Sequence, residues 1–411
     1  MKQGYLKEYF KAIVSKRLSA VETRPESSNQ HEFNATTQLR RVFGDDDQKF
    51  QTDFLYICDD EERIRRASDF LTWYDARRNH PTRTEYRLYY PSSEVTSSAQ
   101  EGDSLFICLK QDGSILCVIG EKESTITSQL YWLFGLTNVD NHRFVVSDDF
   151  DYDSDNLEYA VRQIFEEIGI EYKSDTDDKL LGNLIEKFGQ SFPKTAVFSE
   201  YARSLVTDLC PVEDPDNALF KWYSMEERMF FIFEKYLIQD RVEKGFVHDG
   251  LIDVEDFIQF SLSVQNRRKS RAGLPLENHV CALLDNNKIL YAHGKYTEGK
   301  SKPDFIFPTI ESYHDASYPC DYLTMLGAKT TCKDRWRQVL PEADRIMNKH
   351  VLTLQTSISE DQTDEMIEEN VQLVLPVSIH NTYTPKQQRW IWTMKDFISL
   401  VRERQQYYKK R

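Results

Sequence analysis

The sequence offers little that would tie the protein to a membrane or to an oxidising compartment. No apolar run in its 411 residues is long enough to cross a bilayer, and its first residues do not have the form of a secretory signal. The seven cysteines are an odd set without C-x-x-C spacing, which argues against both a disulfide framework and a zinc site. We therefore expect a cytoplasmic protein with reduced thiols and no membrane partner.

Positive charge is also scarce. The 52 Lys and Arg residues are outnumbered by 67 Asp and Glu residues, so the formal net charge is −15. This disfavours a protein that binds nucleic acid through its overall charge, since such proteins are usually basic. Basic residues do gather locally, at 77–87, at 266–271, which includes Arg268, and at 329–337. Any contact with DNA must come from these patches, whereas each acidic run elsewhere fits a role in solubility alone.

The distribution of short apolar runs divides the chain into two halves. Up to about residue 150, five β-type runs are separated by turn residues: DFLYICD, EYRLYYP, SLFICLK, SILCVIG and RFVVSD. Helical spacing follows in the middle of the chain, and strands and helices then alternate to the end; the helices are expected at 155–172, 225–240 and 253–266. We predict a β-rich N-terminal domain over 1–172, a linker over 173–192 and an α/β domain over 193–411.

Three side chains in the last third of the chain suit one hydrolytic site. Asp304 opens an apolar run typical of a buried strand, and Lys329 lies near the end of an expected strand over 323–331. Adjacent strands would bring these two side chains together. Glu342 lies on an expected helix over 334–347, which could return its carboxylate to the same point.

This set of residues has a definite chemistry. Two carboxylates bind Mg²⁺ or Mn²⁺ in preference to zinc, and a nearby lysine can orient an attacking water. The pattern therefore predicts metal-dependent cleavage of a phosphodiester, with Asp304 and Glu342 as metal ligands and Lys329 beside them. Taken singly, each residue also fits a plain structural role, in a turn, at a strand end or on a helix surface.

The triplet Lys333-Asp334-Arg335 stands next to these residues. Arg and Lys can donate to guanine in the major groove and Asp can accept from cytosine, so alternating cation and acid match consecutive G·C pairs. The triplet is thus a candidate for reading DNA sequence. The alternative is a solvated charge run at a helix start, because Asp is also a good N-cap.

These residues resemble the PD-(D/E)xK nuclease superfamily, whose members carry a Pro-Asp at one strand end and an acid two residues before a lysine on the next. Gly327 stands in place of that second acid. The EcoRII branch of type II restriction endonucleases has the same gap and uses a glutamate on the following helix, which implies Glu342 here. The similarity covers three segments, VQNRRKSRAG at 264–273, TEGKSKPDF at 297–305 and AKTTCKDRWRQ at 328–338.

Two further positions follow from the same resemblance. Glu277, on a helix before the Pro-Asp strand, is implied as an additional catalytic acid, although a surface acid fits it nearly as well. Pro341 departs from the family pattern directly before Glu342, and proline kinks a helix interior. The expected helix must therefore start later or bend at that point.

In the N-terminal half the resemblance is to the DNA-binding pseudobarrel domain of the EcoRII type, based on KRLSA at 16–20 and TRTEYR at 82–87. It implies that Arg83, Glu85 and Arg87 contact DNA, and that a second DNA-reading arm around 27–34 includes His31. The alternative for both segments is an ordinary surface loop of a β-barrel.

The fold implied is a restriction-endonuclease-like α/β core preceded by this β-rich domain. The function implied is Mg²⁺-dependent hydrolysis of double-stranded DNA at a CC-W-GG or CC-N-GG-like site, giving 5′ overhangs. A palindromic site implies a homodimer. The resemblance also implies an N-terminal domain that binds a second, effector copy of the site, and a cognate DNA cytosine methyltransferase as functional partner.

Two other functions remain open on the sequence. One is a DNA-binding regulator whose nuclease core is inactive, and the other is a nuclease that recognises DNA structure or modification. Some relatives flip a base pair out of the stack with wedge residues, for which Lys221, Trp222 and Tyr223 are the nearest candidates. A pair of core aromatics is the favoured interpretation of Trp222 and Tyr223.

Overall fold

A computed structural model describes most of the chain, and its contacts divide it into two compact units. The first comprises Met1–Glu171 with Thr356–Glu360 and Asn381–Thr384, and the second comprises the remaining residues from Tyr172. The described residues are 5–23, 31–136, 144–147, 161, 164–165, 168–170, 178–248, 251–271, 273–330, 332, 335–356 and 358–410. Most of the helix expected over 155–172 lies outside them.

The first unit is built on one eight-stranded sheet, in the order β2-β5-β4-β3-β7-β6-β1-β8. Neighbouring strands are antiparallel except β3 and β7, which are parallel. Each of the five β-type runs predicted from sequence forms a strand. The strands are β1 (Phe10–Arg17), β2 (Glu32–Asn34), β3 (Gln48–Ile57), β4 (Arg65–Asp75), β5 (Tyr86–Tyr89), β6 (Ser104–Lys110), β7 (Ile115–Gly120) and β8 (Val145–Ser147).

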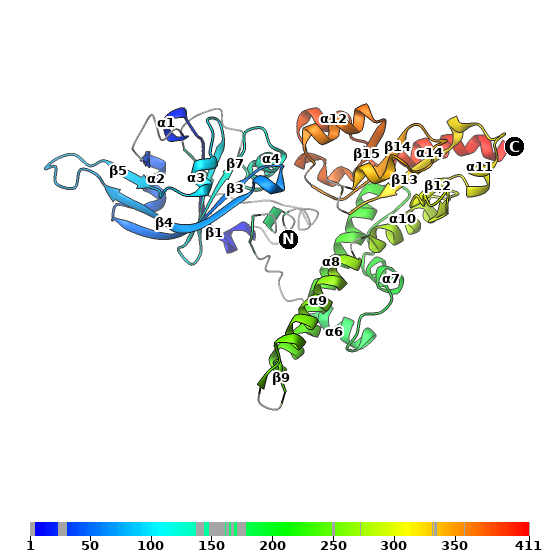
Figure 1. Ribbon diagram of the computed structural model, residues 1–411, viewed down its shortest axis with the longest axis horizontal. Helices are drawn as coiled ribbons and strands as arrows, with labels where there is room; N and C mark the ends of the chain where they lie inside the picture. Colours follow the sequence, from blue (N-terminus) through cyan, green and yellow to red (C-terminus); the bar gives the residue numbers. More distant parts are fainter. Residues whose placement is uncertain are drawn as a thin grey trace. The chain divides into compact units, whose positions relative to one another are not determined.

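Alternation of apolar side chains along these strands creates the core of the first unit. Trp73 and Leu88, paired across β4 and β5, are fully buried, and the Trp73 indole N–H donates to the carbonyl of Gly44 at 3.1 Å. The helices of this unit are α1 (Ala20–Thr23), α2 (Thr37–Phe43), α3 (Glu94–Ser98) and α4 (Thr125–Leu133). Figure 1 shows that β4 and β5 extend, with the loop that joins them, well beyond the other strands.

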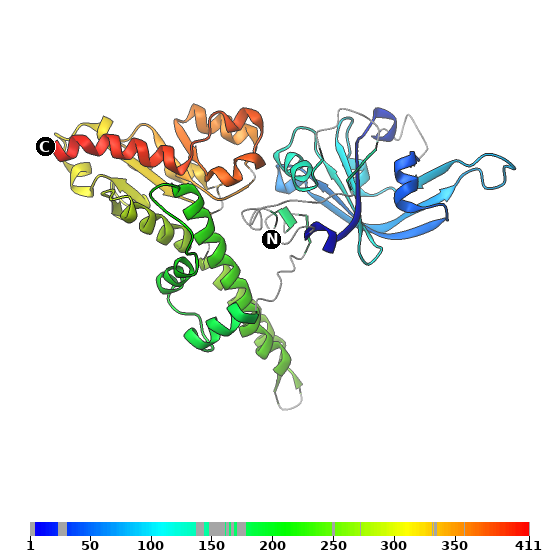
Figure 2. The same ribbon diagram turned by 180° about the vertical axis from the view of Figure 1, so that it is seen from behind.

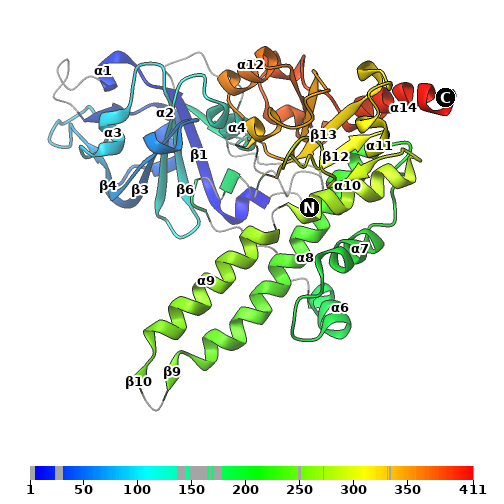
Figure 3. The ribbon, with the colours of Figure 1, turned by 45° about the vertical axis from the view of Figure 1, so that its right-hand side comes forward.

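The second unit begins with helices. The long helix α8 begins after the N-cap residue Asp214, whose side chain accepts a hydrogen bond from the N–H of Asn217. Pro215 occupies its first turn. Figure 3 shows α8 and α9 running side by side, joined by the β9–β10 hairpin. The elements are α6 (Asp178–Phe188), α7 (Thr195–Leu205), α8 (Pro215–Lys244), β9 (Val247–His248), β10 (Leu251–Ile252), α9 (Val254–Arg271) and α10 (Leu274–Asn286).

The segment 173–192, expected to be a linker, contains helix α6. Its Leu180 and Leu184 are buried in one cluster with residues of α7 and α8. From residue 178 onward this segment is therefore packed structure of the second unit. The polar residues that suggested a linker cover only one face of an amphipathic helix.

A five-stranded sheet follows, in the order β11-β12-β13-β14-β15, antiparallel up to β13 and parallel from β13 to β15. Figure 2 shows α14 lying along this sheet, where Phe397 contacts the rings of Phe307 and His350. The elements are β11 (Ala292–His293), β12 (Phe305–Phe307), α11 (Ile310–His314), β13 (Thr324–Ala328), β14 (Lys349–Leu352), α12 (Glu360–Glu368), β15 (Val371–Val374), α13 (Pro385–Gln388) and α14 (Met394–Lys410).

The helix predicted over 334–347 is wrong. Among the described residues 335–347 only a 3-10 turn, η4 (Trp336–Val339), forms, and Glu342 lies in the irregular segment that follows. Pro341 cannot donate to a helical carbonyl, and Ala343 has φ of 53°, a left-handed conformation that ends any helix. Within the part of the chain that is described, no helix is both long and apolar enough to span a membrane.

We expect Asp216→Ala to destabilise the second unit. Asp216 on α8 is 3% exposed, and its carboxylate accepts from the backbone N–H groups of Met394 and Lys395, at 2.8 and 3.0 Å, at the start of α14. Losing this cap leaves buried donors unpaired, which costs about 1–3 kcal/mol. Urea unfolding measures the change. The control is Asp364→Ala, which removes an exposed ion pair with Lys386; equal stability of the two variants would contradict the prediction.

Candidate active site

Asp304 and Lys329 meet where two antiparallel strands lie side by side. Asp304 directly precedes β12 and Lys329 directly follows β13, and Phe305 is paired with Leu326 in the register. The Lys329 Nζ atom lies 2.9 Å from Asp304 Oδ2, and the backbone N–H of Ala328 donates to the same oxygen at 2.7 Å. Both bonds fall on Oδ2, so the carboxylate is held in a fixed orientation while its second oxygen faces elsewhere.

The surroundings of Gly327 leave little room for a side chain on β13. A Cβ atom at this position would lie 2.8 Å from Cγ1 of Val339, on η4, and 3.9 Å from Asp304 Oδ2. Contacts below 3.0 Å force a neighbour to move. The packing of η4 onto the strand therefore favours glycine here, because any larger residue would displace Val339.

Glu342 is half-buried and follows η4 in the chain. Its Oε2 atom is buried and has no hydrogen-bond partner among the described residues. Burial raises the pKa of Glu342, the charge of Lys329 opposes this, and the charge of Asp304 adds to it. A buried carboxylate oxygen without a partner is costly, and a bound cation would offset that cost.

The donor set fits a hard cation. Asp304 and Glu342 supply carboxylate oxygens only, which suit Mg²⁺ or Mn²⁺. No group of three or more His, Cys, Asp and Glu side chains is placed to hold a metal within the described ranges. Mg²⁺ usually keeps several waters and binds through one or two carboxylates, so two protein ligands are compatible with it.

Glu277, on α10, lies beside the strand that leads to Asp304. Its Oε2 atom is 2.7 Å from Nε2 of His293 on β11, and the His293 ring stacks on Phe305. The N–H of Gly294, next to His293, donates to the backbone carbonyl of Asp304 at 2.9 Å. His293 was not singled out from the sequence, because a single histidine in a short polar strand gives no signal of its own.

Of the Lys333-Asp334-Arg335 triplet, the structure describes only Arg335; Lys333 and Asp334 lie outside the described residues. Arg335 is exposed immediately before η4, whose Trp336 is buried. The buried tryptophan anchors the turn and leaves the Arg335 side chain in solvent, where a DNA base could be reached.

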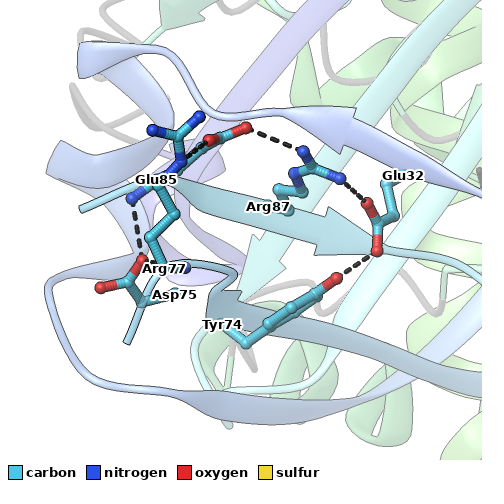
Figure 4. A network of polar contacts seen from close by, with 6 residues as sticks. All are labelled: Glu32, Tyr74, Asp75, Arg77, Glu85 and Arg87. Carbon is cyan, nitrogen blue, oxygen red and sulfur yellow. Dashed lines mark hydrogen bonds and ion pairs between the residues drawn. The ribbon is translucent and has the colours of Figure 1, made fainter. Parts of the chain in front are cut away.

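Two of the DNA-contact candidates in the first unit are engaged with each other. Figure 4 shows Arg87 on β5 between two carboxylates, with Nη1 2.6 Å from Glu32 and Nη2 2.8 Å from Glu85. Glu85 also pairs with Arg77, and the Tyr74 hydroxyl bonds to Glu32. The hydrogen bond from Arg87 lowers the pKa of Glu85, and the bonds to Glu85 and Glu32 raise the pKa of Arg87.

The other two candidates differ in their surroundings. Arg83 is exposed in the loop between β4 and β5. His31, just before β2, lies with its Nε2 atom 3.2 Å from the Ser92 hydroxyl and with its ring edge-on to Tyr90. Arg83 is thus presented to solvent, whereas His31 is held against the sheet.

The remaining candidates lie on α8 and α9. The Nε atom of Arg268 is 2.7 Å from Oε2 of Glu234, a carboxylate that is 1% exposed, while the arginine itself stays half exposed. Trp222 and Tyr223 are buried in the second unit, which confirms the core interpretation and contradicts a wedge made of these two rings. Lys221, beside them, is partly exposed.

Comparison with known proteins places the second half of the chain in a defined class. Residues 230–398 match the family model described as "EcoRII C terminal". The chain is 43% identical over 187 residues to the type II restriction enzyme EcoRII of Escherichia coli. This alignment covers 45% of the chain and 45% of the relative, so it spans about half the length of that protein. The resemblance to EcoRII-type restriction endonucleases is thereby confirmed for the C-terminal half.

Solved structures give weaker matches. Metal-depleted Ecl18kI in complex with uncleaved, modified DNA aligns with a TM-score of 0.45 and 19% identity, over 57% of this chain and 86% of that one. The B3 domain of the UbaLAI restriction endonuclease with cognate DNA aligns with a TM-score of 0.21 and 12% identity, over 33% of this chain and 86% of that one.

We expect Gly327→Ala to destabilise the protein by about 1–3 kcal/mol through overpacking against Val339. Val339→Ala makes room for the added methyl group, so the double variant should lose less stability than the sum of the two single changes. Thermal unfolding of the four proteins in this cycle measures the coupling. Strictly additive losses would show that Val339 does not exclude a side chain from position 327.

Proposed function

We propose that the chain is a type II site-specific deoxyribonuclease of the EcoRII type, which hydrolyses double-stranded DNA at a CC-W-GG or CC-N-GG-like site and leaves 5′ overhangs. The observation that supports it most is the contact of the Lys329 ammonium with Asp304 Oδ2, together with the buried Oε2 atom of Glu342, which has no hydrogen-bond partner among the described residues. A regulator with a lost nuclease core would have no need for this arrangement.

The residues divide the chemistry between them. Asp304 and Glu342 would hold Mg²⁺, which would supply charge to stabilise the phosphorane oxygens and would make a water more acidic. Lys329, held at Asp304 Oδ2, orients the attacking water and adds positive charge beside the phosphate. Glu277, on α10 and paired with His293 of β11, can hold a water beside the site.

Recognition of the DNA sequence is assigned to the charged triplet and to Arg268. Lys333, Asp334 and Arg335 would contact the G·C pairs of each half-site, and Arg268 would contact the backbone. The N-terminal sheet is proposed as the DNA-binding pseudobarrel that takes the effector copy of the site, with Arg83 reaching a base. A cognate cytosine methyltransferase would protect the host genome.

The test is digestion of unmethylated phage DNA with Mg²⁺ by the wild type and by Asp304→Asn, followed by sequencing of the ends. We expect discrete wild-type cuts flanked by CC and GG, and at least a thousandfold slower cutting by Asp304→Asn, on the order expected when an essential catalytic group is lost. DNA that is bound but never cut would favour the regulator. Cuts that ignore sequence would favour a nuclease guided by structure or modification.

Arg83 and Arg87 should respond differently to replacement by alanine. Arg83 is exposed, so Arg83→Ala should weaken DNA binding by the N-terminal half about tenfold, the loss of one good base contact, with unchanged thermal stability. Arg87→Ala, in contrast, should lower thermal stability, because it removes the guanidinium group that pairs with both Glu32 and Glu85. Fluorescence anisotropy with a cognate duplex and melting curves measure both effects. Equal binding by Arg83→Ala and the wild type would contradict the role of Arg83.

A homodimer is supported by the surface of α9. None of its side chains described here is buried, and Val254, Phe257, Ile258 and Leu262 are exposed apolar residues. The helix starts with Glu255 and ends, in sequence, with basic residues, so two copies packed antiparallel would bring acidic and basic ends together. Asp256 is paired with Arg241 within the chain. A continuous exposed apolar face of this kind marks an interaction site.

We therefore expect Ile258→Asp combined with Leu262→Asp to turn a dimer into a monomer, as measured by sedimentation velocity. The control is Val197→Asp, which places the same charge on another exposed apolar residue, on α7. A double variant that sediments as the wild type does would exclude α9 as the dimer contact.

A further inference from the structure

The position of Glu342 is not set by a regular element. The residue follows Pro341 and precedes Ala343, whose backbone is left-handed, so no helix orients its carboxylate. An irregular segment can present a ligand only if its backbone groups are held by other parts of the protein. The side chains that hold residues 341–346 therefore decide where the carboxylate lies.

Lys349, the first residue of β14, holds the segment from within. It is 7% exposed, and its ammonium group lies 2.7 Å from the carbonyl oxygen of Glu342, 3.3 Å from that of Ala343 and 3.0 Å from that of Ile346. A lysine has three N–H donors, and all three are used on this one segment. The ammonium group donates to the carbonyl oxygens of this turn, as backbone N–H groups donate to carbonyl oxygens in a helix.

The loop between β11 and β12 holds the same segment from the other side. The Ser301 hydroxyl donates to the carbonyl of Pro341 at 3.0 Å, and the backbone N–H of Asp344 donates to Glu298 Oε2 at 3.3 Å. The Tyr313 hydroxyl bonds to the same glutamate. Ser301 lies three residues before Asp304 in the chain. The same short loop thus leads to Asp304 and hydrogen-bonds to Pro341 and Asp344, which lie close to Glu342 in the chain.

We propose that Lys349, Glu298 and Ser301 are positioning residues that fix the Glu342 carboxylate opposite Asp304 and so set the affinity of the site for a divalent cation. This inference rests on the metal-binding role proposed for Glu342. Lys349 acts on the backbone of the glutamate itself, and the two loop residues couple that backbone to the strand carrying Asp304.

The test is direct titration of Mn²⁺ into the full chain, with free Mn²⁺ measured by electron paramagnetic resonance. Lys349→Met keeps the length and apolar stem of the side chain but removes its donors, and we expect Mn²⁺ binding to weaken by about tenfold or more, as for other residues that orient metal ligands. Ser301→Ala and Glu298→Gln should weaken it by smaller factors. The control is Lys386→Met, which removes an exposed lysine paired with Asp364 and should leave Mn²⁺ affinity unchanged.

A cleavage assay separates positioning from general damage to the fold. In Lys349→Met and Ser301→Ala, a higher Mg²⁺ concentration should be needed for half-maximal cleavage, and the rate at saturating Mg²⁺ should recover most of the wild-type value. Ser301→Ala removes a single hydrogen bond, so it serves if Lys349→Met does not fold. Folded Lys349→Met or Ser301→Ala protein with wild-type Mn²⁺ affinity would overturn the inference.

Glu342→Gln distinguishes this failure from failure of the proposed function. If Glu342→Gln weakens Mn²⁺ binding while the positioning variants do not, the metal role of Glu342 stands and only the positioning inference is lost. If Glu342→Gln binds Mn²⁺ as the wild type does, the proposed metal site is wrong and the inference falls with it.

Discussion

The contact between the Lys329 ammonium and Asp304 Oδ2 is the constraint on which the catalytic half depends. It joins the start of β12 to the end of β13, and the N–H of Ala328 reinforces it on the same oxygen. Both side chains are less than one-fifth exposed, so the pair is only weakly screened by solvent. Two strands of opposite direction must stay in register for the contact to exist, which links the site directly to the pairing of the sheet.

The remainder of the site is arranged around that pair. Gly327 lets η4 pack against β13, and η4 in turn brings the chain to Glu342. Because the second carboxylate comes from an irregular segment, its support is spread over Lys349 and the β11–β12 loop. The second carboxylate is therefore positioned by several backbone contacts and not by a short motif on one strand. The chemistry proposed for the site depends on those contacts.

The sequence predicted the strands around Asp304 and Lys329 because each is a short apolar run with a charged residue at one end, Asp304 before β12 and Lys329 after β13. It failed between 334 and 347. Trp336, Val339, Ala343 and Ile346 recur at helical spacing and are buried, yet the described backbone turns instead of forming a helix. The spacing of apolar residues indicates which side chains are buried, but it does not fix the backbone conformation. Pro341 was the feature of the sequence that argued against a helix. The pairing of Arg87 with Glu32 joins residues 55 positions apart, so no local pattern could have revealed it.

The central claim is that Asp304 and Glu342 bind one cation beside Lys329. Its most direct test is anomalous diffraction at the manganese edge from crystals grown with Mn²⁺. The account predicts an anomalous peak in contact with carboxylate oxygens of both Asp304 and Glu342. A peak bound elsewhere, with Asp304 contacting only Lys329 and Ala328 and the Glu342 carboxylate free of metal, would contradict it.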